Sequence, residues 1–282
     1  MNCAWDAYIN LIPKRFRDQV DKLGRENLLE VRLRLGRPPE LVLRKESIFL
    51  KETVLQDDIN FSVNIASRYS PWTATSVSYG YITAQGGHRV GICGEVNTHE
   101  GKIISLRSAT SISLRVARDY PGISGNLKNL KESTLIIGSP GSGKTTLLRD
   151  YIRQISESGT GAIAVVDERQ EIFPMAGDTF CFAPGMRTDV LSGCMKKSGI
   201  EIVLRTMTPQ IIAVDEITAQ EDCTALLHAA WCGVTLLATA HAASRLDLER
   251  RTIYRTLLEQ KLFENLVILH SDKSWLLERM EV

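Results

Sequence analysis

The sequence predicts an α/β protein in which a smaller α+β domain precedes a domain built on a parallel sheet. Two patterns predict this fold. Strands that alternate apolar and polar residues fill much of the chain before about residue 119. Short, wholly apolar strands, each followed by a stretch with helical spacing, fill the chain after it. With 282 residues, the chain is long enough for two domains that each bury a core.

The first domain is expected over residues 1–119. Its opening, "MNCAWDAYINLIPKRFRDQ", predicts a short amphipathic helix that breaks at Pro13. Residues 28–55, "LLEVRLRLGRPPELVLRKESIFLKETVL", place apolar side chains on one face of half-buried antiparallel strands, with a turn between Gly36 and Pro39. More strands are expected from residue 78 onward, with turns at Gly86-Gly87 and at residues 98–101.

A linker is expected at residues 120–131, because "YPGISGNLKNLK" is rich in Pro, Gly and Asn. The second domain is then expected over residues 132–282. Its strands, including "STLIIG", "GAIAVVD", "QIIAVDE" and "GVTLLATAHA", show no polar alternation. Such strands are buried on both faces, which predicts a parallel sheet between two layers of helices.

Composition excludes several classes of protein. The 34 Lys and Arg balance 33 Asp and Glu, so the net charge of +1 gives no general attraction to nucleic acid or an anionic membrane. Six cysteines without C-x-x-C or Cys/His spacing indicate neither a zinc site nor a redox dithiol, and are expected to be buried free thiols. No export signal or membrane-spanning run is found, so a cytoplasmic protein is expected.

The strongest motif is a phosphate-binding loop. A strand runs into it and an amphipathic helix leaves it, so backbone N–H groups converge on phosphates. Lys144 is expected at the β- and γ-phosphates, Thr145 at Mg²⁺, and Thr146 near the α-phosphate. No N-K-x-D motif is present, which favours ATP over GTP. The loop matches G-x-x-x-x-G-K-[ST] in full, with Gly138, Ser139, Pro140, Gly141, Ser142, Gly143, Lys144 and Thr145.

Acidic pairs follow two of the apolar strands. In "IIAVDEI", Asp215 is expected to hold Mg²⁺ and Glu216 to polarise the attacking water, on the ground that adjacent strand residues face opposite ways. In "IAVVDERQE", Asp167 and Glu168 end another strand and are expected at the same crevice, although an acidic surface turn explains this motif equally well.

A third strand, "LLATAHA", ends with Thr239 and His241. Both side chains are expected to reach the same crevice. His241 is either a sensor of the γ-phosphate or a structural hydrogen-bonding residue.

The order of these motifs resembles the secretion-ATPase superfamily of type II and type IV machines, which are RecA-like P-loop ATPases. Residues from about 28 to 245, including "GYITAQGGHRVGICGEV", more closely resemble the stage III sporulation AA family of endospore formers. The superfamily usually reads G-E-I-R-D where this chain reads Asp215-Glu216-Ile217-Thr218-Ala219, so the Arg-Asp pair is absent. The resemblance implies catalytic roles for Glu168, Glu216 and His241.

The superfamily also uses arginines of its N-terminal domain at the γ-phosphate, which implies a catalytic role for Arg89, Arg107 or Arg115. Each of these, taken singly, is more simply explained as a solvated strand arginine. Arg205, in "LRTMTP", matches the family's Leu-Arg before the strand and is expected to brace a neighbouring subunit.

The resemblance further implies a homohexameric ring that uses ATP and Mg²⁺. The ring would dock on membrane-embedded components of the channel between mother cell and forespore, on the mother-cell side, and contact the membrane only through them. Two alternatives stay open. One is a RecA-like nucleic-acid motor or loader, against which the chain shows no basic stripe interleaved with aromatic residues. The other is a nucleotide-gated scaffold with negligible turnover.

Overall fold

The computed structural model describes residues 1–67, 80–125, 127, 130–159 and 161–280, which form two compact units. The first unit comprises the described part of Met1–Asp119 together with Pro174–Phe182, and the second comprises the described parts of Tyr120–Phe173 and Ala183–Val282. Each unit has its own hydrophobic core. Residues 78 and 79 of the predicted strand block lie outside the described residues, as do 126, 128 and 129 of the predicted linker.

The first unit is built on an antiparallel sheet of strand order β3-β2-β1-β6-β5-β4. The half-buried strands predicted from residue 28 are confirmed, with the turn between Gly36 and Pro39 joining the first two. A three-residue 3-10 turn at Gln85–Gly87 joins β4 to β5, as the Gly-Gly pair predicts. The strands are β1 (Leu28–Arg34), β2 (Glu40–Leu43), β3 (Ser47–Phe49), β4 (Tyr81–Thr83), β5 (Arg89–His99) and β6 (Lys102–Arg115).

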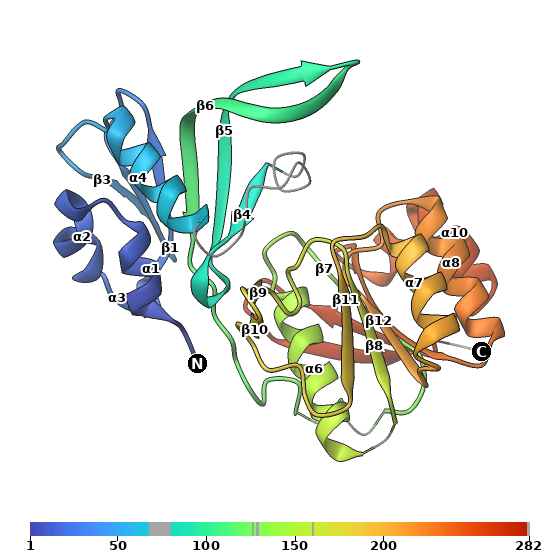
Figure 1. The fold of residues 1–282 in the computed structure, drawn as a ribbon. Helices are drawn as coiled ribbons and strands as arrows, with labels where there is room; N and C mark the ends of the chain where they lie inside the picture. The colour runs from blue at the N-terminus through green and yellow to red at the C-terminus, as the bar shows by residue number, and fades with distance from the viewer. Residues whose placement is uncertain (68–79, 126, 128–129, 160, 281–282) are drawn as a thin grey trace. The chain divides into compact units, whose positions relative to one another are not determined.

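The helices among the described residues of this unit are α1 (Trp5–Leu11), α2 (Lys14–Asp21), α3 (Gly24–Asn27) and α4 (Gln56–Ser67) (Figure 1). Pro13 is the N-cap of α2, which confirms the predicted break. Two short strands, β9 (Met175–Ala176) and β10 (Thr179–Phe180), pair with each other and belong to this unit although they follow the phosphate loop in the chain.

His88 links the N-terminal segment of this unit to the end of β6. Its Nε2 lies 2.9 Å from the carbonyl oxygen of Ala4, and the backbone N–H of Ala117 donates to its Nδ1 at 3.0 Å. Burial lowers the pKa of His88 to about 4, so the ring stays neutral and can make both hydrogen bonds.

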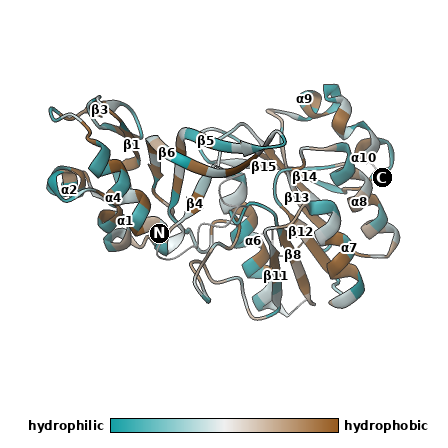
Figure 2. Ribbon diagram, turned by 45° about the horizontal axis from the view of Figure 1, so that its top comes forward, coloured by the Kyte–Doolittle hydropathy of each residue, from teal (hydrophilic) through white to brown (hydrophobic). Residues whose placement is uncertain are grey.

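The second unit is built on a sheet of strand order β11-β8-β12-β13-β7-β14-β15, parallel except for the last strand. All residues of β7, β8, β12 and β14 are buried, which confirms the predicted burial of both faces, and Figure 2 shows apolar residues along the strands labelled β8 and β12. The strands are β7 (Thr134–Gly138), β8 (Ile163–Asp167), β11 (Thr188–Ser192), β12 (Ile211–Val214), β13 (Thr235–His241), β14 (Asn265–Leu269) and β15 (Trp275–Arg279).

Helices cover both faces of this sheet. On one face Leu135, Val166 and Ile212 pack in a cluster with apolar residues of α7 (Lys196–Thr206), α8 (Gln220–Trp231) and α10 (Arg255–Glu259). The alternate residues of the strands are buried on the opposite face, where Figure 1 shows α6 (Lys144–Ser158). Helix α9 (Arg245–Arg250) and the 3-10 turn Thr252–Tyr254 precede α10.

The described part of the predicted linker is attached to the second unit. The fully buried carboxylate of Asp150, on α6, accepts hydrogen bonds from the N–H groups of Gly122 and Ser124 at 2.8 Å each, and from the Ser124 hydroxyl at 2.7 Å. Because these bonds are buried, the turn after Tyr120 is held against α6 rather than free in solvent.

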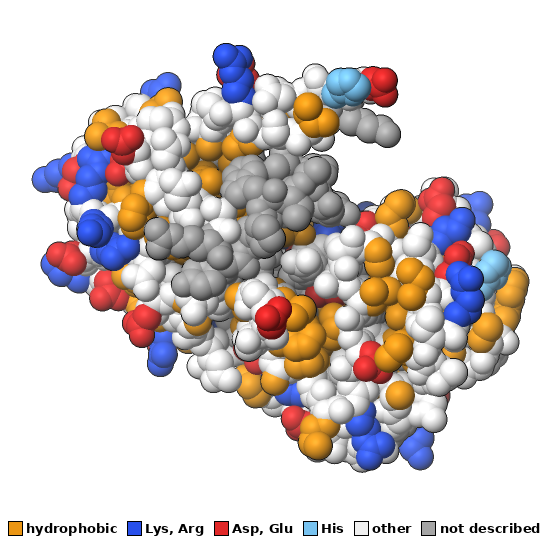
Figure 3. Space-filling view, viewed as in Figure 1, with side chains coloured by type: hydrophobic (Ala, Val, Ile, Leu, Met, Phe, Trp, Pro, Cys, Tyr) orange, Lys and Arg blue, Asp and Glu red, His pale blue; other side chains and the backbone are white. Residues whose placement is uncertain are grey.

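The described residues can be compared with the sequence predictions about membrane spans, surface charge and cysteines. Within the described residues, no helix is long and apolar enough to cross a membrane. Figure 3 shows basic and acidic side chains interspersed on the visible face of each unit, without a basic stripe there. All six cysteines are free, but the prediction that they are buried is wrong for most: Cys223 alone is buried, and Cys93 and Cys232 are exposed.

Candidate nucleotide site

The phosphate loop lies between the end of β7 at Gly138 and the start of α6 at Lys144. Gly141 and Gly143 have φ angles of 73° and 105°, which side chains rarely adopt. At Gly138, a Cβ would lie 2.5 Å from the Ser142 hydroxyl and 2.7 Å from the carbonyl oxygen of Leu269. The three glycines of the motif are therefore needed for the path of the backbone.

The ammonium group of Lys144 makes its hydrogen bonds to other groups of the protein. Its Nζ donates to the carbonyl oxygens of Gly138 at 2.9 Å and Ser139 at 3.1 Å, and lies 3.0 Å from Nδ1 of His241. Burial lowers the pKa of Lys144, and the charges of Asp215 and Glu216 oppose that effect. The lysine thus places a buried ammonium group at the loop.

Asp215 lies beside the loop and fits the predicted Mg²⁺ position. The Thr145 hydroxyl donates to Oδ2 of Asp215 at 2.6 Å, and the Thr239 hydroxyl donates to its Oδ1. No group of three or more His, Cys, Asp or Glu side chains that could hold a metal occurs among the described residues. Two protein oxygens fit Mg²⁺ nevertheless, because this ion usually takes its other ligands from phosphates and water. Thr146 is half-buried in the first turn of α6.

Glu216 adopts a left-handed backbone conformation, with φ of 53°. Its N–H donates to the Thr239 hydroxyl at 2.8 Å, and the N–H of Ile217 donates to the Thr239 carbonyl oxygen at 2.9 Å. A conformation of this kind costs about 1–3 kcal/mol and persists where its surroundings impose it. Strand β12 ends at Val214, so the turn separates Asp215 from Glu216, and the prediction that strand alternation does so is wrong.

The carboxylate of Glu216 is held on both oxygens. Nε2 of His241 contacts Oε1, and Nη1 of Arg169 donates to Oε2 at 2.8 Å. Since Lys144 can only donate to Nδ1 of His241, the imidazole carries its proton on Nε2 and donates it to Glu216. Lys144, His241, Glu216 and Arg169 therefore form a continuous chain of polar contacts.

Asp167 is not part of this series of polar contacts and instead binds the backbone of a loop. It is 1% exposed, and its carboxylate accepts the N–H groups of Glu171 at 2.9 Å, Ile172 at 3.0 Å and Phe173 at 2.9 Å. Burial raises the pKa of Asp167 to about 6; these hydrogen bonds oppose the rise, and Asp215 adds to it. In its described contacts, Asp167 therefore serves the backbone of residues 171–173.

Glu168 belongs to a separate cluster at the same edge of the sheet. Its carboxylate contacts Nζ of Lys196, which is 4% exposed and lies 3.6 Å from Oδ2 of Asp222. Asp222 in turn accepts the N–H of Thr218 at 3.0 Å, just before α8 begins. In this structure one buried lysine therefore joins Glu168 to the start of α8.

The predicted arginines have partners within their own units. Arg89 lies over the ring of Tyr81 at 3.9 Å from its centre, Nη1 of Arg107 lies 2.9 Å from Oε1 of Glu95, and Nε of Arg115 lies 3.3 Å from Oε2 of Glu30. All three pairs belong to the first unit. Arg205 lies on α7 with its side chain 75% exposed, and its Nε donates to the carbonyl oxygen of Glu201 at 3.2 Å. The roles suggested for these arginines stay predictions.

Three cations at the site carry no signal in the sequence pattern: Arg169, Lys196 and Lys273. Lys273, in the turn between β14 and β15, donates to the carbonyl oxygens of Gly141 at 2.7 Å and Ser142 at 3.0 Å. It is more than a hundred residues from the loop that it contacts, so only the strand order brings the two together.

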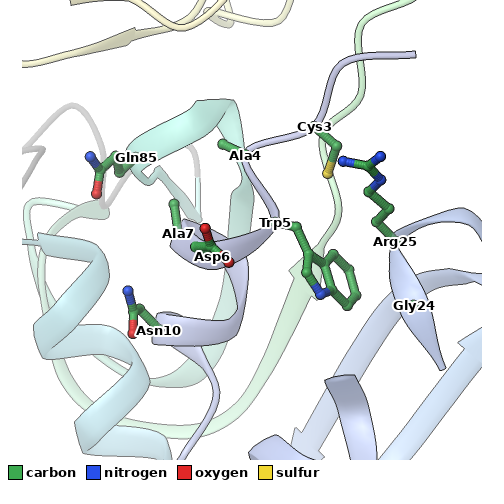
Figure 4. A pocket seen from close by; sticks show the side chains of 9 residues that line it. All are labelled: Cys3, Ala4, Trp5, Asp6, Ala7, Asn10, Gly24, Arg25 and Gln85. Atoms are coloured by element: carbon green, nitrogen blue, oxygen red, sulfur yellow. The ribbon is translucent and has the colours of Figure 1, made fainter. Parts of the chain in front are cut away.

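A separate pocket of about 700 Å³ lies in the first unit (Figure 4). It is lined by residues 3–7, Asn10, Gly24, Arg25 and Gln85, and Figure 4 shows the guanidinium of Arg25 beside Cys3. None of the predicted site residues lines it. The phosphate loop and the acidic strand ends therefore remain the candidate site.

Comparison with solved structures supports the predicted fold. The chain is similar to the ATPase DotB of Yersinia pseudotuberculosis, with a TM-score of 0.60 and 18% identity over 94% of this chain and 78% of that one. It is also similar to the pilus retraction motor PilT with bound ADP, with a TM-score of 0.58 and 17% identity over 89% of this chain and 76% of that one. At these identities the likeness shows the fold alone, and the predicted fold class is confirmed.

Comparison by sequence identifies the family. The family model described as sporulation stage III, protein AA, matches residues 8–275. Stage III sporulation protein AA of Bacillus subtilis is 35% identical over 276 residues, which cover 93% of this chain and 90% of that protein. The resemblance predicted from the sequence is confirmed, and the chain belongs to the family of sporulation stage III protein AA.

Proposed function

We propose that the chain is a mechanochemical ATPase that binds ATP with Mg²⁺, hydrolyses it to ADP and phosphate, and energises or assembles the channel between mother cell and forespore. One observation carries this proposal. The phosphate-loop lysine, the Thr145–Asp215 pair and the His241–Glu216 pair meet at the ends of three neighbouring strands, β7, β12 and β13. This set supplies phosphate binding, a metal position and a group to orient water.

Each residue then has a defined task. The backbone N–H groups of residues 138–146, except Pro140, which has none, and the ammonium of Lys144 bind the phosphates. Thr145 and Asp215 hold Mg²⁺, which neutralises charge on the phosphates when it is bound. Glu216 orients the attacking water and accepts its proton, and His241 keeps the Glu216 carboxylate in place.

The roles of Glu168 and of the first-unit arginines are further parts of the proposal. Glu168 assists catalysis after its carboxylate leaves Lys196. One of Arg89, Arg107 and Arg115 supplies positive charge to the γ-phosphate, and Arg205 braces a neighbouring subunit. Such charge stabilises the transition state of phosphoryl transfer and raises its rate by large factors.

The setting follows from the family and from the likeness to named ATPases. The ring is a homohexamer on the mother-cell side, in contact with membrane-embedded components of the stage III sporulation complex. Membership of the sporulation stage III protein AA family supports this setting, and the fold shared with DotB and PilT supports a nucleotide-driven machine. Direct contact with nucleic acid is not expected.

Nucleotide binding and phosphate release by purified protein test the proposal. Lys144→Ala is expected to abolish binding of a fluorescent ATP analogue, because it removes the buried cation. Glu216→Gln is expected to keep binding and lower kcat by about 100-fold or more, because the amide cannot accept a proton. Arg245→Ala is a matched surface control. Arg245 also pairs with a glutamate, its Nε lying 3.0 Å from Oε1 of Glu249, and this pair lies outside the site.

Other outcomes point to the alternatives. Binding without measurable turnover, alone or with membranes carrying the partner complex, would support the scaffold. Salt-sensitive affinity for single-stranded DNA together with faster ATP turnover would support the nucleic-acid motor. Absence of nucleotide binding in the unaltered protein would contradict all three.

A further inference from the structure

Arg169 makes a contact with the candidate site that the phosphate-loop motifs do not contain. Its Nη1 donates to Oε2 of Glu216 at 2.8 Å, while its side chain is 44% exposed. The two preceding residues take other directions, since Asp167 binds backbone N–H groups and Glu168 contacts Lys196. The turn after β8 therefore aims one cation at the carboxylate that is proposed to activate water.

In the structure, Glu216 is occupied by protein donors. Its two carboxylate oxygens hold His241 and Arg169, and its backbone is fixed by Thr239. A carboxylate that activates water must accept a hydrogen bond from that water. At least one of its present partners has to move before Glu216 can do so.

A nucleoside triphosphate provides a competing partner for the arginine. Lys144 connects to Glu216 through His241, so phosphates that draw the lysine away also loosen the histidine. A guanidinium binds phosphate oxygens through two parallel N–H groups and keeps its charge at every relevant pH. Arg169 is half-exposed and is the last member of the series of polar contacts that starts at Lys144. Its guanidinium can therefore turn from the Glu216 carboxylate to the outermost phosphate.

We propose that Arg169 is a γ-phosphate sensor that distinguishes a nucleoside triphosphate from a diphosphate. Without nucleotide it holds Glu216; in the triphosphate complex its guanidinium moves to the γ-phosphate oxygens and leaves Glu216 to bind the attacking water. This inference rests on the proposed ATPase function and adds to it a sensor within the same polypeptide, in the turn after β8, the strand that neighbours β12.

The test compares the affinity of the purified full chain for ADP and for a non-hydrolysable ATP analogue, each with Mg²⁺. Arg169→Ala is expected to raise the Kd of the triphosphate analogue about tenfold, the worth of one charge-assisted hydrogen-bonded contact, and to leave the Kd of ADP within about twofold. Arg169→Lys, which keeps the charge but loses the fork, is expected to lie between the two.

Arg245→Ala is the matched control, because Arg245 is 42% exposed and also pairs with a glutamate, Glu249. It is expected to change neither Kd. Thermal unfolding of each variant checks that the second unit remains folded, and Arg169→Lys serves as the informative variant if Arg169→Ala unfolds.

Each other outcome has a definite meaning. Equal weakening of both nucleotides would assign Arg169 a purely structural role, and no change in either would remove it from the site; both overturn the inference and leave the ATPase proposal standing. Tighter binding of the triphosphate analogue to Arg169→Ala would show that the arginine opposes triphosphate binding, and it would also overturn the inference. Failure of the unaltered chain to bind either nucleotide would overturn the inference together with the proposed function.

Discussion

Asp167 ends strand β8 and Glu216 lies just beyond the end of the neighbouring strand β12, yet their surroundings give them different chemistry. Asp167 is enclosed by a loop whose N–H groups bind it, and burial raises its pKa to about 6. Glu216 stands on a left-handed turn and meets the imidazole of His241 and the guanidinium of Arg169. Burial and local partners, more than residue type, therefore separate a structural carboxylate from a candidate for catalysis.

The raised pKa of Asp167 predicts a pH dependence of stability. The native carboxyl binds its proton more tightly than the unfolded one, whose pKa is near 3.8, so the free energy of unfolding falls as the pH rises from about 4 to about 6 and stays lower above that. This group alone accounts for a fall of about 3 kcal/mol. The side chain in Asp167→Asn cannot ionise, so this fall in the free energy of unfolding with pH is expected to be missing from that variant.

Urea unfolding of both proteins at several pH values between about 4 and about 7 measures the difference. The free energy of unfolding of the unaltered protein, minus that of Asp167→Asn, should become smaller as the pH rises from about 4 to about 7. His88, whose pKa is lowered to about 4, works in the opposite direction in the first unit and is unchanged in the comparison. An identical pH slope in the two proteins would show that Asp167 does not titrate there.

At the scale of elements, the hairpin of β14 and β15 supports the phosphate loop. Strand β14 pairs with β7 up to Gly138, and the turn after it carries Lys273 to the carbonyl oxygens of Gly141 and Ser142. These carbonyl groups belong to the loop whose N–H groups are proposed to bind phosphate. Lys273 therefore stabilises the path of the loop from the side of its carbonyl oxygens.

Lys273→Ala is expected to weaken ADP and the ATP analogue by the same factor, about three- to tenfold, because the loop serves every phosphate. The measurement is the Kd of each nucleotide. Lys261→Ala is a matched control, since Lys261 is also an exposed lysine with positive φ, 49° against 74° for Lys273. Weakening confined to the triphosphate would contradict this prediction and would instead place Lys273 at the γ-phosphate.

At the scale of the whole molecule, the chain passes between its two units at residues 119–120, 173–174 and 182–183. The second of these passages directly follows the loop that Asp167 binds, residues 171–173. The loop that Asp167 binds is therefore directly continuous in sequence with residues 174–182 of the first unit.

The proposed ring makes a prediction at this scale. Light scattering is expected to show an increase in mass, up to that of a hexamer, when a non-hydrolysable ATP analogue and Mg²⁺ are added, because bound nucleotide favours the assembled state. Lys144→Ala is expected to remain at its starting mass. A monomer under every condition, with nucleotide demonstrably bound, would contradict assembly by the isolated chain.

The sequence by itself determined the fold class, the phosphate loop, the strand ends that carry Asp215, Glu216 and His241, and the family. These features are encoded locally, because the burial period of a strand and the glycines of a tight loop depend on neighbouring residues. The order of the motifs along the chain carried the resemblance, which comparison with the Bacillus subtilis protein bears out.

Only the tertiary structure decided which charged groups meet. It turned Asp167 inward, paired Glu168 with Lys196, brought Arg169 to Glu216 and carried Lys273 to the phosphate loop. These partners lie between 4 and 132 residues apart in the sequence, and most of them lie in turns and loops that follow the strands. Their contacts depend on strand order and on the angle of each turn, which no local pattern of residue types specifies.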